Sequence, residues 1–178
     1  MNIRFSGFGG QGIVIAGYIF GNAAIKDGNN AIQTQSYGAE SRGGACKSDV
    51  IIQEQAIQEL APSELDVLVA MSHSAMEKYV DTLKKGGLLI IDSDLVSPSK
   101  SFEKKYKIYS IPATDLAFKK FGRKIIGNMV IIGYLTALTK LVSKRSVRAT
   151  IERNVPKGTE KLNLDAFELG YKLGNKTK

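Results

Sequence analysis

Residues 7–12 read Gly7-Phe8-Gly9-Gly10-Gln11-Gly12, and this glycine-rich turn decides the fold. It follows a short apolar segment, residues 1–6, that predicts a strand. It precedes residues 13–26, where apolar residues recur at helical spacing. A strand, a glycine turn and a helix in this order open many α/β folds whose strands run parallel.

The rest of the chain continues the alternation of strand and helix. Further strands are predicted at residues 31–35, 45–53, 67–71, 88–91 and 107–111. Helices are predicted at residues 72–85, 114–121, 125–141, 143–154 and 164–173, with Ser72 and Ser143 as N-caps. Strands separated by helices of this length predict a Rossmann-like α/β fold, with a parallel sheet and helices on both faces. We expect a single domain over residues 1–178.

The composition is that of an ordinary globular protein, with 43% hydrophobic and 24% charged residues among 178. Cys46 is the only cysteine and His73 the only histidine. The sequence therefore excludes an intrachain disulfide, a cysteine-ligated metal cluster and a multi-histidine zinc site. No stretch has the apolar length of a membrane span, and residues 1–10 lack the regions of a signal peptide. We expect a cytoplasmic protein without a membrane partner.

The net charge of +8 is unevenly distributed along the chain. Residues 1–99 carry 7 lysine and arginine residues against 11 acidic ones, whereas residues 100–178 carry 18 against 6. A basic half raises the question of nucleic acid. The cations are scattered as on ordinary helices and form no known nucleic-acid motif, so we expect no nucleic-acid partner. An acidic partner surface or an anionic substrate explains the charge equally well.

The glycine turn is the first feature with chemical content. Gly7, Gly9 and Gly12 have the spacing of a dinucleotide-binding loop, and a helix N-terminus offers N–H groups to an anion. That fingerprint also needs an acidic residue at the end of the second strand, where this chain has Gln35 and Ser36. Asp27 lies before that strand instead. Contact of the turn with an anion or with a partner's backbone is therefore favoured. One alternative is an independent nucleotide-binding oxidoreductase. A second is close packing of Gly12 without any ligand.

Beyond the turn, the sequence resembles the gamma subunit of 2-oxoacid:ferredoxin oxidoreductases nearly from end to end. It is most similar to the subunits of the 2-oxoglutarate type. The segments that carry the resemblance are residues 7–12, Gln33-Thr34-Gln35-Ser36-Tyr37-Gly38, Glu40-Ser41-Arg42-Gly43-Gly44-Ala45, Asp49-Val50-Ile51-Ile52, Ile90-Ile91-Asp92-Ser93-Asp94, Asn128-Met129-Val130, Val155-Pro156-Lys157-Gly158-Thr159 and residues 163–170.

The resemblance implies a chemistry to which this chain contributes as one subunit. In such enzymes a 2-oxoacid is decarboxylated on thiamine diphosphate with Mg, electrons leave through iron–sulfur clusters, and the acyl group passes to coenzyme A. The resemblance implies that these cofactors lie on alpha, beta and delta-type partner subunits, that this subunit has no catalytic residue and no metal ligand, and that it is inactive alone. We expect the isolated chain to expose apolar surface and to form a homodimer.

The resemblance also implies a place for this subunit beside coenzyme A. The polar loop 36–44 combines an aromatic residue, an arginine suited to phosphate and two glycines with open N–H groups. Pairing of Arg42 with Glu40 or with a neighbouring subunit's carboxylate is an equally weighted alternative. The expected binding residues are Gly7, Gly9, Gly10, Gln11, Gly12, Tyr37, Arg42, Gly43 and Gly44.

Other polar residues favour structural roles. His73 follows a strand but has no identifiable catalytic partner, so a helix-start or interface histidine is favoured. Asp92 and Asp94 flank a serine; they favour turn formation and capping over a cation site. Cys46 is expected to be a small buried or half-buried apolar residue. The predicted helix 125–141 is more apolar than a surface helix, which favours central packing over an interface.

Overall fold

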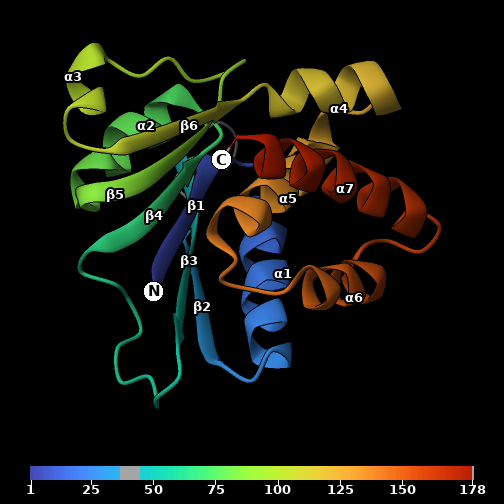
Figure 1. Ribbon diagram of the computed structural model, residues 1–178, viewed down its shortest axis with the longest axis horizontal. Helices are drawn as coiled ribbons and strands as arrows, with labels where there is room; N and C mark the ends of the chain where they lie inside the picture. Colours follow the sequence, from blue (N-terminus) through green and yellow to red (C-terminus); the bar gives the residue numbers. More distant parts are fainter. Residues whose placement is uncertain (37–44, 178) are drawn as a thin grey trace.

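In a computed structural model of the chain, residues 1–36 and 45–177 are described, and six strands form one sheet in the order β2-β3-β1-β4-β5-β6 (Figure 1). The strands are β1 (Asn2–Phe8), β2 (Asn30–Ser36), β3 (Ala45–Gln53), β4 (Leu65–Ala70), β5 (Leu83–Asp92) and β6 (Lys107–Ile111). The helices are α1 (Ile13–Lys26), α2 (His73–Tyr79), η1 (Val80–Thr82), α3 (Lys100–Glu103), α4 (Ala113–Phe121), η2 (Lys124–Ile126), α5 (Gly127–Thr139), α6 (Lys144–Asn154) and α7 (Glu160–Lys176).

The predicted α/β class is confirmed, but the sheet is not wholly parallel. Strands β1, β4, β5 and β6 run parallel, whereas β3 is antiparallel to both of its neighbours, β1 and β2. The physical reason is the length of the connection, because only eight residues separate the end of β2 from the start of β3, and a parallel pair needs a crossover of about a dozen residues or more. Strand β3 therefore separates β2 from β1.

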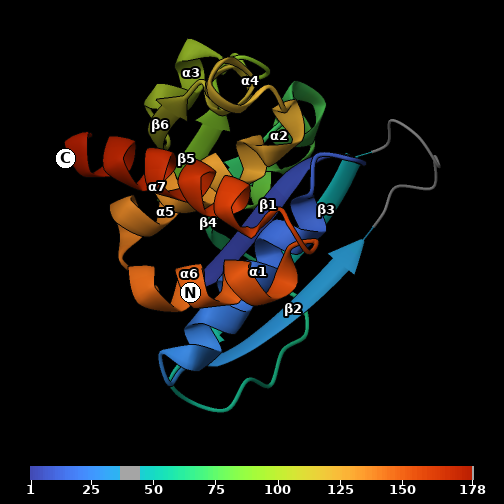
Figure 2. The same cartoon turned by 90° about the vertical axis from the view of Figure 1, so that its right-hand side faces the viewer.

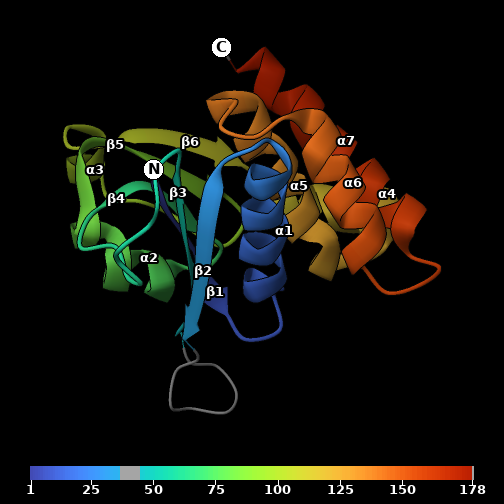
Figure 3. The ribbon, with the colours of Figure 1, turned by 90° about the horizontal axis from the view of Figure 1, so that it is seen from below.

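Helices cover both faces of the sheet, as expected (Figure 3). Helices α1, α5, α6 and α7 lie on one face, and α2 and α3 lie on the other. Each face has its own cluster of buried apolar side chains. The larger one joins the sheet to α1, α5 and α7, and the smaller one joins it to α2. No helix in the described part of the chain is long and apolar enough to cross a membrane.

The predicted helix 72–85 is wrong at its C-terminal end, where the single turn η1 follows α2 and β5 begins at Leu83. Ser72 caps α2 as predicted, since its Oγ accepts a hydrogen bond from the Ala75 N–H, but α2 ends at Tyr79. Leu83 begins β5 and is buried beside Leu65 of β4, so tertiary burial overrides the helical spacing. Gly86 and Gly87, which directly follow the predicted helix in the sequence, lie inside β5.

Helix α5 is the central packing helix of the larger cluster, which confirms the favoured interpretation of residues 125–141. Its residues from Gly127 to Ala137 are all buried. Helix α7 crosses it at two glycines. A Cβ on Gly170 would overlap the carbonyl oxygen of Val130, and a Cβ on Gly133 would overlap that of Phe167. The two helix backbones are therefore in direct contact, which only glycine permits at these positions.

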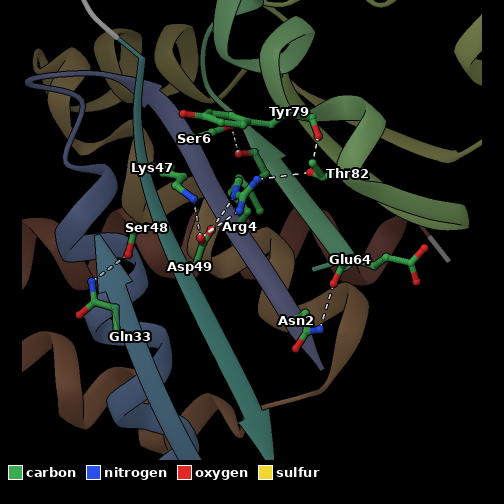
Figure 4. Close-up of polar contacts among 11 residues, drawn as sticks. Asn2, Arg4, Ser6, Gln33, Lys47, Ser48, Asp49, Glu64, Tyr79 and Thr82 are labelled. Carbon is green, nitrogen blue, oxygen red and sulfur yellow. Dashed lines mark hydrogen bonds and ion pairs between the residues drawn. The ribbon is translucent and has the colours of Figure 1, made fainter. Parts of the chain in front are cut away.

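A buried ion pair holds the centre of the sheet on the α2 face (Figure 4). Arg4 of β1 and Asp49 of β3 face each other in register, with Nε–Oδ1 and Nη2–Oδ2 distances of 2.5 and 2.9 Å. Their side chains are only 6% and 2% exposed. The Lys47 Nζ lies 2.9 Å from the same carboxylate, and the Arg4 guanidinium lies 4.8 Å from the centre of the Tyr79 ring. The cluster pairs each buried charge with an opposite one.

Asp27 ties the end of α1 to the start of α6. Its carboxylate accepts hydrogen bonds from the Ser143 N–H and Oγ–H and from the Ser146 Oγ–H. Burial raises the pKa of Asp27, but the hydrogen bonds from Ser143 and Ser146 outweigh it, so the pKa lies below its ordinary value. The ionised carboxylate therefore stabilises the folded chain.

We expect Asp27→Asn to lower the free energy of unfolding by about 1 kcal/mol at neutral pH, because it weakens charge-assisted hydrogen bonds at a largely solvated site. Because the pKa of Asp27 is lower in the folded state, its contribution to stability is complete above the unfolded-state pKa of about 3.9. The contribution is lost as the pH falls through the lower, folded-state pKa. Urea unfolding between pH 7 and pH 2.5 should therefore give curves for the two proteins that converge in acid. Asp165→Asn, at an exposed position on α7, is the control. Parallel curves for the wild type and Asp27→Asn would contradict this role.

Candidate functional site

The glycine turn joins β1 to α1 at the carboxyl end of β1. Gly10 and Gly12 have φ angles of +95° and +72°, a conformation that L side chains rarely adopt. Gly12 is the N-cap residue of α1, and no side chain caps the first turn of this helix. That first turn also has no acidic residue. The first N–H groups of α1 are therefore available to a partner from outside the described residues.

Two of the predicted binding residues have structural roles in the turn. The Gln11 side chain bridges two strands, because its Oε1 accepts from the Phe8 N–H at 2.6 Å and its Nε2 donates to the Met71 carbonyl at 2.8 Å. A Cβ on Gly7 would collide with that same Gln11 side chain. The residue at position 7 must therefore be glycine for Gln11 to hold the ends of β1 and β4 together.

Packing explains Gly12 as well. A Cβ on Gly12 would overlap the side-chain amide of Asn128, whose Nδ2 donates to the Gly12 carbonyl at 3.3 Å. Asn128 is buried in the first turn of α5, so it locks the start of α1 against α5. The sequence pattern did not identify this role of Asn128, since its partner lies 116 residues away.

Gly9 differs from the other glycines of the turn. A Cβ built on it meets no atom within 4 Å, and its φ lies outside the left-handed region. Among the glycines of residues 1–36 and 45–177, it alone combines these two properties. The described residues therefore supply no reason for glycine here, whereas close approach by a molecule from outside would.

A groove with a cavity volume of about 640 Å³ opens beside the turn. It is mostly apolar, and Phe8 and Tyr18 at its rim are each 40% exposed. Its lining residues are Phe8, Gly9, Gly10, Gly12, Ile13, Val14, Ile15, Tyr18, Gln33, Gln35, Cys46 and Ile125. The groove thus brings together the predicted glycines and apolar residues that the sequence did not single out.

Ile125, 56% exposed, links this groove to two smaller cavities. One of about 420 Å³ includes Arg123, and one of about 370 Å³ includes Lys124. An apolar surface with cations at its margin therefore surrounds the turn. The sequence shows Arg123 and Lys124 as two adjacent cations, but only the fold places them beside the glycine turn.

The other predicted binding residues, Tyr37, Arg42, Gly43 and Gly44, lie outside the described residues. Gln35, near the end of β2, and Cys46, near the start of β3, both line the groove. Cys46 is buried as expected, and burial raises the pKa of its thiol. A protonated, buried thiol is a small apolar wall residue and a poor nucleophile.

Asp92, the last residue of β5, and Asp94 cap α4, as predicted. Asp92 accepts hydrogen bonds from the N–H groups of Ala113 and Thr114, each at 3.1 Å, and Asp94 accepts from the Asp115 N–H at 2.7 Å. Burial raises the pKa of Asp92. These bonds engage both carboxylates at the start of α4. Within residues 1–36 and 45–177, no group of three or more His, Cys, Asp or Glu is arranged to hold a metal ion.

His73 lies at the start of a helix, as favoured from the sequence. It is the first residue of α2, its side chain is 49% exposed, and its Nε2 lies 3.4 Å from the Glu77 Oε1.

The topology gives no support to the dinucleotide alternative. In that fold the strand beside β1 is parallel to it and ends in the ribose-binding acid. Here the antiparallel β3 occupies that position, and β2, which ends in Gln35 and Ser36, lies one strand further out. Asp27 lies before β2 and is engaged by Ser143 and Ser146.

Residues 2–173 match the family described as pyruvate ferredoxin/flavodoxin oxidoreductase. The 2-oxoglutarate synthase subunit KorC of Methanocaldococcus jannaschii is 48% identical over 172 residues, which cover 96% of this chain and 92% of the relative. The keto/oxoacid ferredoxin oxidoreductase gamma subunit from Geobacter sulfurreducens PCA is a solved structure with 40% identity, a TM-score of 0.83 and 97% coverage of both chains. The 2-oxoglutarate:ferredoxin oxidoreductase from Magnetococcus marinus shares the fold at a TM-score of 0.89, with 23% identity over 99% of this chain and 31% of that one.

Proposed function

This chain belongs to the pyruvate ferredoxin/flavodoxin oxidoreductase family, and we propose from that premise that it is the gamma subunit of a cytoplasmic 2-oxoacid:ferredoxin/acceptor oxidoreductase. The 2-oxoacid is 2-oxoglutarate, which the complex decarboxylates oxidatively to form the acyl-CoA. The sequence identity of 48% over nearly the whole of a 2-oxoglutarate synthase subunit carries this proposal. The subunit is one gamma-type domain over residues 1–178.

The subunit has no catalytic residue of its own and is inactive alone. Thiamine diphosphate, Mg and the iron–sulfur clusters belong to alpha, beta and delta-type partner subunits and supply the decarboxylation and electron transfer. The residues of this chain agree with that division, since its one cysteine cannot ligate a cluster. This chain supplies a surface that partners cover and that borders the coenzyme A region.

The groove beside the glycine turn is suited to that role. Its apolar walls fit an alkyl-amide chain, and the uncapped start of α1 is adjacent to where an anionic group would lie. Arg123 and Lys124 add positive charge at the margin. Arg42 is proposed to contact a phosphate of coenzyme A, because its guanidinium offers a bidentate fork.

The test is reconstitution of the complex with Gly9→Val. We expect this variant to leave the thermal midpoint of the isolated chain unchanged, because a Cβ at position 9 meets no atom within 4 Å and the residue needs no unusual φ. In the complex it should lower either subunit retention or the apparent affinity for coenzyme A by roughly tenfold or more, which corresponds to about 1.4 kcal/mol. Ala56→Val, at an exposed position in the loop after β3, is the matched control.

Arg42→Ala in the same assay distinguishes a contact between Arg42 and a coenzyme A phosphate from a contact between Arg42 and another subunit. Loss of a phosphate contact should weaken coenzyme A by roughly ten- to a hundredfold, since such bonds contribute about 1.5–3 kcal/mol. The decarboxylation half-reaction should be unaltered. Loss of an interface contact should instead loosen the complex and lower all activities together. If the complexes with Gly9→Val and Arg42→Ala both assemble normally and keep the wild-type dependence on coenzyme A, the proposed position of this surface is wrong. Dye reduction by the isolated chain with 2-oxoglutarate would contradict its non-catalytic role.

A further inference from the structure

Strand β2 is an open edge of the sheet without the usual protection. It is the first strand in the sheet order, and Figure 2 shows it at the free margin. Among the described residues, only β3 pairs with it, in an unbroken register of seven residue pairs without a bulge. Its sequence, Asn30-Ala31-Ile32-Gln33-Thr34-Gln35-Ser36, has no charge and no proline. Exposed edges are normally kept short or carry lysine, proline or a bulge, because unpaired N–H and C=O groups recruit another strand.

The opposite edge of the same sheet is protected in the usual way. Strand β6 has five residues and begins with Lys107. Lys104 and Lys105 precede it, and Pro112 follows it directly. The β6 edge is therefore short and flanked by lysines and a proline, whereas the β2 edge is longer and has neither. The contrast indicates that β2 is covered by another strand in the protein's working state.

An apolar stripe on α1 lies along the same margin. Val14, Tyr18 and Ile25 recur at helical spacing, and Tyr18 and Ile25 are 40% and 53% exposed. Helix α1 packs over β2 and β3, and the Gln33 Nε2 donates to the Val14 carbonyl at 3.0 Å. Val14 and Tyr18 share one groove with Gln33 and Gln35 of β2, so the stripe faces the β2 margin. Large exposed apolar side chains beside an open edge mark a surface that another molecule covers.

We propose that the β2 edge pairs antiparallel with the β2 edge of a second copy of this chain, which joins two sheets into one and packs α1 against its symmetry mate. Helix α1 packs against β3 and β2, with Gly17 and Gly21 over Ser48 and Val50 of β3. A two-fold axis halfway between the paired edges therefore turns the exposed α1 stripes of the two copies toward each other on the same face of the joined sheet.

A second copy fits this surface because a two-fold axis sets each patch against itself. Any charged residue near the axis would face its own like charge, and β2 has none. The α1 stripe is apolar and therefore complementary to itself. This inference does not rest on the proposed function, since it is argued from the edge and the stripe. Val14 and Tyr18 also line the groove, so the contact between copies would border the part of the groove at Gly9 and Gly10.

The test is sedimentation equilibrium of the full chain over a concentration series. We expect a dimer in the wild type. Thr34→Lys on β2 and Tyr18→Glu on α1 should each raise the dimer dissociation constant by roughly a hundredfold, since symmetry repeats an effect of about tenfold in both copies. Ser110→Lys on the exposed side of β6 and Phe118→Glu, 51% exposed on α4, are the matched controls and should leave the constant unchanged. Far-ultraviolet circular dichroism checks that each variant is folded.

Disulfide trapping identifies the paired element. In a Cys46→Ala background, single cysteines at Ile32, Gln33, Thr34 and Gln35 are oxidised in turn. Residues directly opposite each other in an antiparallel pair have Cα atoms about 4.5–5.5 Å apart, within the range of a disulfide. At least one position should give a covalent dimer, whereas Ser110→Cys should give none. A wild type that is monomeric throughout, or a dimer that persists unchanged in Thr34→Lys and Tyr18→Glu, overturns the proposal. Cross-linking to a different subunit of the reconstituted complex in place of a second copy also overturns it.

Discussion

Gly170→Ala is expected to destabilise the protein by about 2–3 kcal/mol, although the same exchange in an exposed helix usually stabilises by about 1 kcal/mol. The added Cβ would overlap the Val130 carbonyl oxygen and lie 2.7 Å from its carbon. Both obstructing atoms belong to the backbone of α5, so no side-chain rotation relieves the contact. The helices must separate, and α5 loses packing over its buried length. Differential scanning calorimetry should show a thermal midpoint lower by roughly 5–10 °C for a chain of this length.

The control for this prediction is another helical glycine. In Gly21→Ala, on α1, the nearest heavy atom to the new Cβ is the Val50 Cγ1 at 3.4 Å, an ordinary contact. That variant should be as stable as the wild type or slightly more stable, because alanine favours a helix. Equal midpoints for Gly170→Ala and the wild type would show that α5 and α7 tolerate a wider separation than the structure indicates.

Asp49→Leu should cost about 3–5 kcal/mol, the largest single effect expected in this protein, because it leaves the buried Arg4 guanidinium without a counter-charge. Arg4→Met should cost less. The remaining carboxylate keeps the Lys47 Nζ at 2.9 Å, so its charge is still paired. Urea unfolding monitored by circular dichroism measures both effects.

The double variant Arg4→Met/Asp49→Leu completes the cycle. We expect it to be more stable than Asp49→Leu alone, because replacing both members of a buried pair leaves only Lys47, which is partly exposed and retains solvent. Additive effects of the two single exchanges would contradict the pairing shown in Figure 4.

Local patterns predicted the elements well where the deciding residues are close in sequence. The predicted segments 13–26, 45–53 and 107–111 coincide with α1, β3 and β6. The N-caps Ser72 and Ser143 were also confirmed, because a serine cap acts on an N–H group three residues away. A glycine turn between a strand and a helix is a similarly local signal.

Contacts between distant residues could not be predicted in this way. The direction of β3 depends on which strands it pairs with in the sheet. The helix predicted at 72–85 ends early because Leu83 is buried beside Leu65 in the sheet. At the site, the pattern indicated the glycines but not Asn128, which meets Gly12 only after α5 has docked. Phe8, Tyr18 and Ile125 carry no motif, and their exposure beside one groove follows from the tertiary structure alone.

The contact between α5 and α7 also bears on the order of events during synthesis. Helix α5 is buried on all sides in the folded chain, yet one of its covering helices, α7, extends to Lys176. A ribosome completes α5 well before it completes α7, so a nascent chain presents the apolar α5 without that cover. Docking of α7 closes the core, and the chain then has its finished surface for other subunits. We therefore expect the larger core to close only after α7 has been synthesised.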